Sequence, residues 1–200
     1  LNMDAIIVLY NSKSVILQCL SSLNCASGAA DISCNVYCVD NQPELSWPNL
    51  SILIDYPHLK IFPIKSDTNS GFSGGCKLAI EKYSLSQNVL LLNPDAFVMQ
   101  DFFQKLSHDI VKYRGSDNLL IGTRAVSIDG SSPTRNAGSM PELFAYKNHN
   151  VIAPNKAFYG STIWPLAACL FIKSNDNFSE LFDMPFFLTL EEPYLVRNLK

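Results

Sequence analysis

With 200 residues, 48% of them hydrophobic, the chain is long enough to bury one full core, and we expect a single domain over 1–200. The net charge of -3 and the pI near 5.5 give no electrostatic footprint for nucleic acid, which excludes it as an expected partner. No apolar run approaches the length of about 18 residues that a membrane-spanning helix needs.

The cysteines indicate a reduced protein. Cys19, Cys38, Cys76 and Cys169 lie in apolar, periodic runs, where cysteine behaves as a small hydrophobic residue. No pair has the short spacing of zinc ligands. The N-terminus shows neither a basic region nor a small-residue cleavage site, so no signal peptide is expected. The sequence therefore predicts a cytoplasmic protein without disulfides.

Apolar runs predict the strands in chain order. The first runs are rich in β-branched residues and are short, as buried strands are. Pro63 lies inside the third run and cannot donate to a sheet ladder, so that strand is expected near an edge. The segments expected as strands are 4–10, 35–39, 59–64, 88–92 and 119–127, and the segment 163–172 is again apolar.

Helical spacing and breakers predict the remaining elements. A helix is expected to begin at Asn11 and Ser12 and to break at Gly28. A glycine-rich loop at 69–75 is expected to lead into a helix at 76–84. Further helices are expected at 100–114 and 175–182, a loop at 42–57, a turn at 129–130 and a long loop at 131–158.

Polar residues follow several of the predicted strands. Strands alternate with helices in the first half, which predicts an α/β fold with a mostly parallel sheet and helices on both faces. Asn11 follows the first strand, Asp40 and Asn41 end the second, and Asn93 and Asp95 follow the strand at 88–92. Because ligands of open α/β sheets bind at the carboxyl ends of the strands, these residues predict a nucleotide crevice.

The stretch around Asp95 suggests a metal site. Asn93 and Pro94 follow the apolar run; the proline ends the strand and places Asp95 just past its carboxyl end. A carboxylate there suits a hard divalent cation, Mg²⁺ or Mn²⁺, shared with a phosphate-bearing ligand. The alternative is that Asn93 and Asp95 only form a turn, as Asn, Pro and Asp often do.

These motifs together resemble the family 2 glycosyltransferases with the GT-A fold, especially the bacterial rhamnosyltransferase-like members. The resemblance covers nearly the whole chain and is carried by five motifs in the expected order. They are IVLYN at 7–11, VDN at 39–41, NSGFSG at 69–74, LNPD at 92–95 and FDMPFFLTLEE at 182–192.

The resemblance implies a Rossmann-like central sheet and a function. It implies a metal-dependent, inverting transfer of sugar from a nucleotide-sugar donor to a glycan or a polyprenyl-diphosphate-linked acceptor, in surface polysaccharide synthesis. Residues 1–100 would form the nucleotide-sugar-binding half and residues 101–200 the acceptor and catalytic half. Peripheral association with the inner face of the cell membrane, through a C-terminal segment that this chain lacks, is a further expectation.

The resemblance also implies roles for single residues. Asp95 would bind Mg²⁺ or Mn²⁺, with Asn93 in place of the first Asp of the Asp-x-Asp motif. Glu192 would be the catalytic base, with Glu191 beside it. The residues expected to bind the nucleotide-sugar are Tyr10, Asn11, Asp40, Asn41, Asn69, Gly71, Gly74, Asn93 and Ala167.

The sequence departs from the family pattern at several positions. Cys76 replaces the usual Asn, Ala167 the usual Gly, Glu192 the usual Asp, and Tyr194 an acidic residue. These changes keep a second hypothesis open, a degenerate, non-catalytic member that binds nucleotide or glycan. A nucleotidyltransferase is a third hypothesis, which is disfavoured because no basic glycine-rich loop follows the first strand.

Overall fold

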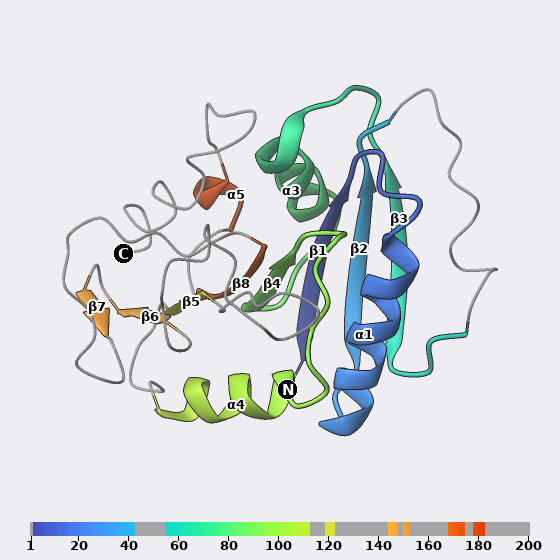
Figure 1. Ribbon diagram of the computed structural model, residues 1–200. Helices are drawn as coiled ribbons and strands as arrows, with labels where there is room; N and C mark the ends of the chain where they lie inside the picture. The colour runs from blue at the N-terminus through green and yellow to red at the C-terminus, as the bar shows by residue number, and fades with distance from the viewer. Residues whose placement is uncertain are drawn as a thin grey trace, which may run out of the picture.

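The computed structural model describes residues 2–42, 55–112, 119–122, 144–147, 150–152, 168–174 and 178–182 (Figure 1). The strands are β1 (Met3–Leu9), β2 (Cys34–Asp40), β3 (Leu59–Lys65), β4 (Asn88–Leu92), β5 (Leu119–Gly122), β6 (Phe144–Lys147), β7 (Asn150–Ile152) and β8 (Cys169–Lys173). The helices are α1 (Ile16–Ala29), α3 (Gly71–Lys82), α4 (Phe102–Lys112) and α5 (Phe178–Leu181).

All of these strands belong to one mixed sheet, in the order β3-β2-β1-β4-β8-β5-β6-β7. The strands β3, β2, β1 and β4 are mutually parallel. β8 is antiparallel to both of its neighbours, β4 and β5, and β6 is antiparallel to both β5 and β7. All strands except β8 and β6 therefore run in one direction, which confirms the mostly parallel sheet and places β3 at an edge.

Helices cover both faces of the sheet, as expected, because alternate strand residues point to opposite sides (Figure 1). On one face, Ala5 and Ile7 of β1 share a buried cluster with Leu20 of α1 and Phe103 of α4. On the other face, Ile6 and Val8 of β1 share a buried cluster with Cys76 and Ala79 of α3, Phe178 of α5, and Phe182 directly after α5.

The strands of the first half lie where the apolar runs predicted them. β1, β2 and β4 are buried along almost their whole length, since a strand covered on both faces needs no polar alternation. Cys19, Cys38, Cys76 and Cys169 are buried as predicted, while Cys25 is exposed.

The boundaries of α1 differ from the prediction. The helix begins at Ile16 rather than at Ser12, whose backbone oxygen accepts hydrogen bonds from the amides of Val15 and Ile16. Gly28 does not break the helix, which continues to Ala29. Gly28 has a packing role there, because a Cβ at this position would lie 2.8 Å from the ring of His58.

The second half differs more from the prediction. The long loop expected at 131–158 contains β6 and β7, which pair as a short antiparallel unit at the sheet edge beside β5. Strands of four and three residues are too short to show a period in the sequence. The turn expected at 129–130 and residues 43–54 of the expected loop lie outside the described residues.

The expected division into a nucleotide-sugar-binding half, 1–100, and an acceptor and catalytic half, 101–200, stays a prediction.

In the part of the chain that the structure describes, no helix has both the length and the apolar composition to span a bilayer.

Candidate functional site

The carboxyl ends of β1, β2 and β4 meet at one edge of the sheet. β1 pairs in register with β2, Leu9 beside Asp40, and with β4, Ile6 beside Leu91. The predicted residues Tyr10, Asn11, Asp40, Asn41, Asn93 and Asp95 all follow or close these strands. The structure therefore brings together at one edge the polar residues that lie far apart in the sequence.

The turn after β1 exposes Tyr10 and Asn11. Asn11 has a left-handed backbone with φ of 51°, which Asn tolerates better than most residues. The Ser12 hydroxyl is buried and bonds back to Tyr10, accepting from its amide at 3.1 Å and donating to its carbonyl at 3.0 Å. The Tyr10 side chain is 60% exposed, so its ring is available to a ligand at this edge.

The end of β2 is tied to the turn after β1. The amide of Gln42 donates to Asp40 Oδ1 at 3.0 Å, and the amide of Asn11 donates to Gln42 Oε1 at 2.9 Å. Asp40 is 7% exposed. Gln42 was not predicted as a site residue, because a Gln after a strand carries no recognisable sequence signal.

Asn41 joins β2 to the start of α3. Its Nδ2 donates to the Gly71 carbonyl at 2.7 Å, and its Oδ1 accepts from Ser70 Oγ at 3.4 Å. Its backbone amide donates to Leu9 O at 2.9 Å. With 1% exposure, Asn41 is part of the buried framework of the site, and a direct nucleoside contact through its side chain stays a prediction.

The glycine-rich motif is part of a helix rather than a loop, which corrects the expected helix at 76–84. α3 begins at Gly71, whose φ of 72° suits only glycine readily, and whose amide donates to Asn69 Oδ1 at 3.1 Å. A Cβ at Gly75 would lie 2.7 Å from Val8 Cγ1, and one at Gly74 would lie 2.6 Å from Ser70 Cβ. Close packing of α3 on β1 therefore explains Gly75, and it brings the positive end of the helix dipole beside Asn41.

The turn after β4 carries Asp95. The amide of Asn93 donates to Ala168 O at 2.9 Å, so the sheet ladder ends at the residue before Pro94, as predicted. The carbonyl of Asn93 accepts from the amide of Ala96 at 3.1 Å and from Cys19 Sγ at 3.6 Å. Asp95 itself is exposed at this edge.

The donor set at β4 fits a cation that is shared with a ligand. Among the described side chains, no group of three or more His, Cys, Asp or Glu is arranged to hold a metal ion by itself. One exposed carboxylate, Asp95, with the amide oxygen of Asn93 nearby in the chain, supplies hard oxygen donors. Mg²⁺ and Mn²⁺ take few protein ligands when phosphate and water complete their coordination.

Three predicted site residues, Ala167, Glu191 and Glu192, lie outside the described residues. Ala168, the residue after Ala167, is described, and its carbonyl accepts the hydrogen bond from the amide of Asn93 at the end of β4. The catalytic base therefore stays a prediction from the sequence.

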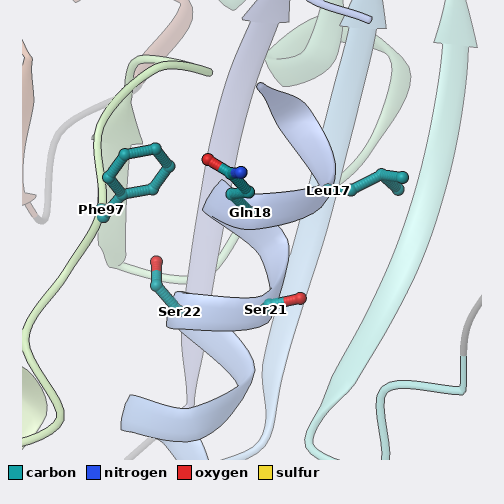
Figure 2. Close-up of a pocket in the computed structure, with 5 residues that line it drawn as sticks. All are labelled: Leu17, Gln18, Ser21, Ser22 and Phe97. Atoms are coloured by element: carbon teal, nitrogen blue, oxygen red, sulfur yellow. The ribbon is translucent and has the colours of Figure 1, made fainter. Parts of the chain in front are cut away.

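A shallow groove of about 460 Å³ lies between α1 and the segment after Asp95. Leu17, Gln18, Ser21, Ser22 and Phe97 line it. Figure 2 shows the ring of Phe97 across from Gln18 and Ser22 of α1. None of the predicted site residues lines this groove.

The fold resembles solved structures at low sequence identity. S. aureus TarS 1-349 in complex with UDP matches with a TM-score of 0.50 and 21% identity over 67% of this chain and 39% of that one. A second structure of S. aureus TarS 1-349 gives a TM-score of 0.49 and 22% identity, over 64% of this chain and 37% of that one. HddC from Yersinia pseudotuberculosis gives a TM-score of 0.47 and 12% identity, over 98% of this chain and 86% of that one.

The chain thus spans about two fifths of the TarS 1-349 structures that it matches. No protein-family model and no curated protein sequence matches it. At these identities the comparisons establish the fold alone, which is α/β and GT-A-like.

Proposed function

We propose that the chain is a metal-dependent glycosyltransferase that takes its sugar from a nucleotide-sugar donor. The observation that carries this proposal is the meeting of Tyr10, Asp40, the start of α3 and Asp95 at the carboxyl edge of a GT-A-like sheet. Similarity in fold to a protein that was crystallised with UDP supports a nucleotide as the donor's leaving group.

Each part of this edge suits a different part of a nucleotide-sugar. The exposed ring of Tyr10 and the carboxylate of Asp40 suit a nucleoside, through stacking and through a hydrogen bond to a hydroxyl or base edge. The first turn of α3 favours negative charge. Asp95 would hold Mg²⁺ or Mn²⁺, which when bound offsets the charge that develops on the diphosphate leaving group.

The acceptor would be a glycan or a polyprenyl-diphosphate-linked saccharide, attacked with inversion, as the motif resemblance implies. An acceptor hydroxyl is a poor nucleophile near neutral pH, so a carboxylate must take its proton during attack. We assign this role to Glu192, and a supporting role to Glu191. The same proposal includes three finer statements. The transferred sugar is a rhamnose, the product is a surface polysaccharide, and the protein acts at the inner face of the cell membrane.

A panel of UDP-, GDP- and dTDP-sugars with Mn²⁺ tests the proposal, with release of free nucleoside diphosphate as the readout. Glu192→Gln should lower transfer by about a hundred- to ten-thousand-fold while donor binding stays nearly unchanged, because the lost interaction belongs to the transition state. Glu191→Gln is the matched comparison and should cost stability or orientation more than chemistry. Loss in Glu191→Gln alone would reverse the two roles.

The competing function is nucleotide or glycan binding without turnover. Asn93 favours it, because a neutral amide replaces the first carboxylate of the metal motif. Metal-dependent binding of a nucleoside diphosphate, with no release from any sugar nucleotide and any acceptor, would establish this second function instead.

A further inference from the structure

The segment that carries Asp95 is fastened at both ends to α1. The thiol of Cys19 donates to the carbonyl of Asn93 at 3.6 Å, a normal length for the large sulfur atom. The amide of Val98 donates to Ser22 Oγ at 3.1 Å. Cys19 and Ser22 are three positions apart on the helix and so lie on the same face, toward this segment.

The two side chains are also connected to each other. Ser22 Oγ donates to the carbonyl of Cys19 at 2.8 Å, so the serine hydroxyl is both donor and acceptor between the helix and the segment. The Cys19 side chain is fully buried, so its thiol makes this contact with Asn93 away from solvent.

The helix is a rigid support for this attachment. The inner face of α1 packs in the main core, where Ile16, Leu20 and Leu23 are buried. At its other end, Gln104 Nε2 of α4 donates to the carbonyl of Ala29 at 2.9 Å. Figure 2 shows Ser22 and Gln18 of α1 facing the segment that carries Phe97, two residues after Asp95.

We propose that Cys19 and Ser22, the α1 clamp, are positioning residues that hold Asp95 ready to bind the cation shared with a nucleoside diphosphate. This inference rests on the proposed function. Asp95 is exposed and belongs to neither a helix nor a strand, so without the clamp it must be ordered when the ligand binds. Fixing a group in its binding geometry in advance removes that entropic cost from the affinity.

The Mn²⁺ requirement of UDP binding tests the clamp, with UDP as the probe and GDP and dTDP in parallel. Ser22→Ala should raise the Mn²⁺ concentration for half-maximal binding about three- to tenfold, the range expected for one hydrogen bond. Ser22→Thr retains a hydroxyl and should therefore show the same Mn²⁺ concentration for half-maximal binding as the parent. Ser21→Ala is the matched control, because Ser21 lines the same groove one position away and is exposed.

A second pair of variants separates positioning from loss of core packing. Cys19→Ala should raise the Mn²⁺ requirement about as much as Ser22→Ala does. Cys38→Ala removes an equally buried thiol from the same cluster and should leave the requirement unchanged. A hydrogen-exchange measurement should show faster exchange of the Val98 amide in Ser22→Ala, whether or not a nucleotide is present.

The outcomes separate the clamp from the proposed function. A parent protein that binds no nucleoside diphosphate with Mn²⁺ contradicts the proposed function and the positioning role together. A parent that binds with Mn²⁺, beside Cys19→Ala and Ser22→Ala variants with an unchanged Mn²⁺ requirement, contradicts the positioning role alone.

Discussion

The ends of β2 and β4 flank β1 at the same edge of the sheet, yet they are built in opposite ways. At β2, Asp40 and Asn41 are buried. The Asn41 side chain is hydrogen-bonded to Ser70 and Gly71 at the start of α3. At β4, the carboxylate of Asp95 is exposed, and only the backbone on either side of it is fastened to α1.

The difference shows how one edge combines a framework with an accessible charge. A buried polar side chain must have its hydrogen bonds satisfied, and Asn41 is satisfied by protein groups. A carboxylate that binds a cation must instead remain open to solvent and ligand. The β2 side therefore supplies rigidity, and the β4 side supplies the charge that the proposed function requires.

The largest expected difference is in the alkylation rates of cysteine thiols. Cys38 lies on the β2 side and Cys19 on the β4 side. Burial raises the pKa of Cys38 in β2 to about 12, and burial, followed by nearby thiols and Asp95, raises the pKa of Cys19 further. Cys25 is exposed whereas both of these thiols are buried, so Cys25 should be alkylated at least about a thousandfold faster than either at pH 8. Mass spectrometry of the native protein after timed alkylation measures these rates.

The same experiment compares the two sides directly. Cys19 should react faster than Cys38 despite its higher pKa, because Cys19 lies against an irregular segment, which opens locally more easily than β2, a strand paired on both sides. A Cys19 rate equal to that of Cys25 would contradict the burial of α1's inner face. In denaturant without reductant all six thiols should react. Recovery of four or fewer free thiols would contradict the prediction that the protein contains no disulfide.

Gly75→Ala tests the rigidity of the β2 side. The added methyl would lie 2.7 Å and 2.9 Å from the two methyls of Val8, a β-branched side chain with little freedom. We expect a loss of about 1–3 kcal/mol in the free energy of unfolding, measured with urea. Gly28→Ala is the control, because the His58 ring can rotate away, and it should change stability by less than about 1 kcal/mol.

Asn41→Ala and Asp95→Ala should differ in stability. Asn41→Ala removes a buried donor to Gly71 O and should cost about 1–3 kcal/mol of unfolding free energy. Asp95→Ala changes an exposed residue and should stay within about 0.5 kcal/mol of the parent. Equal losses in urea unfolding would show that the two sides are not built differently.

The sequence predicted the first half of the fold well because its signals are local. β1, β2 and β4 are continuous apolar runs, and Pro63 marked β3 as an edge strand. The position of β8 between β4 and β5 depends on pairing between distant segments, which no local pattern encodes. The start of α3 was misplaced because glycine has low helix propensity, which close packing against Val8 overrides.

Only part of the candidate site was predicted, because only some of its residues carry a local sequence signal. Asn93 and Asp95 follow β4 as expected, since a proline after an apolar run is a clear strand end. The framework role of Asn41 depends on its contact with Gly71, thirty positions away. Cys19 and Ser22 carry no sequence signal for a positioning role. A buried Cys or a helical Ser that positions a loop cannot be told from one that does not by the sequence around it.

Isothermal titration of UDP, with GDP and dTDP in parallel, tests the central claim most directly. The parent should bind its preferred nucleotide at least about tenfold more tightly with Mn²⁺ than with EDTA, and Asp95→Ala should lose this difference. Asp67→Ala, which removes an exposed carboxylate from the segment after β3, should keep it. Equal affinity of the parent in Mn²⁺ and EDTA, with Asp95→Ala indistinguishable from it, would contradict the metal-binding role of Asp95.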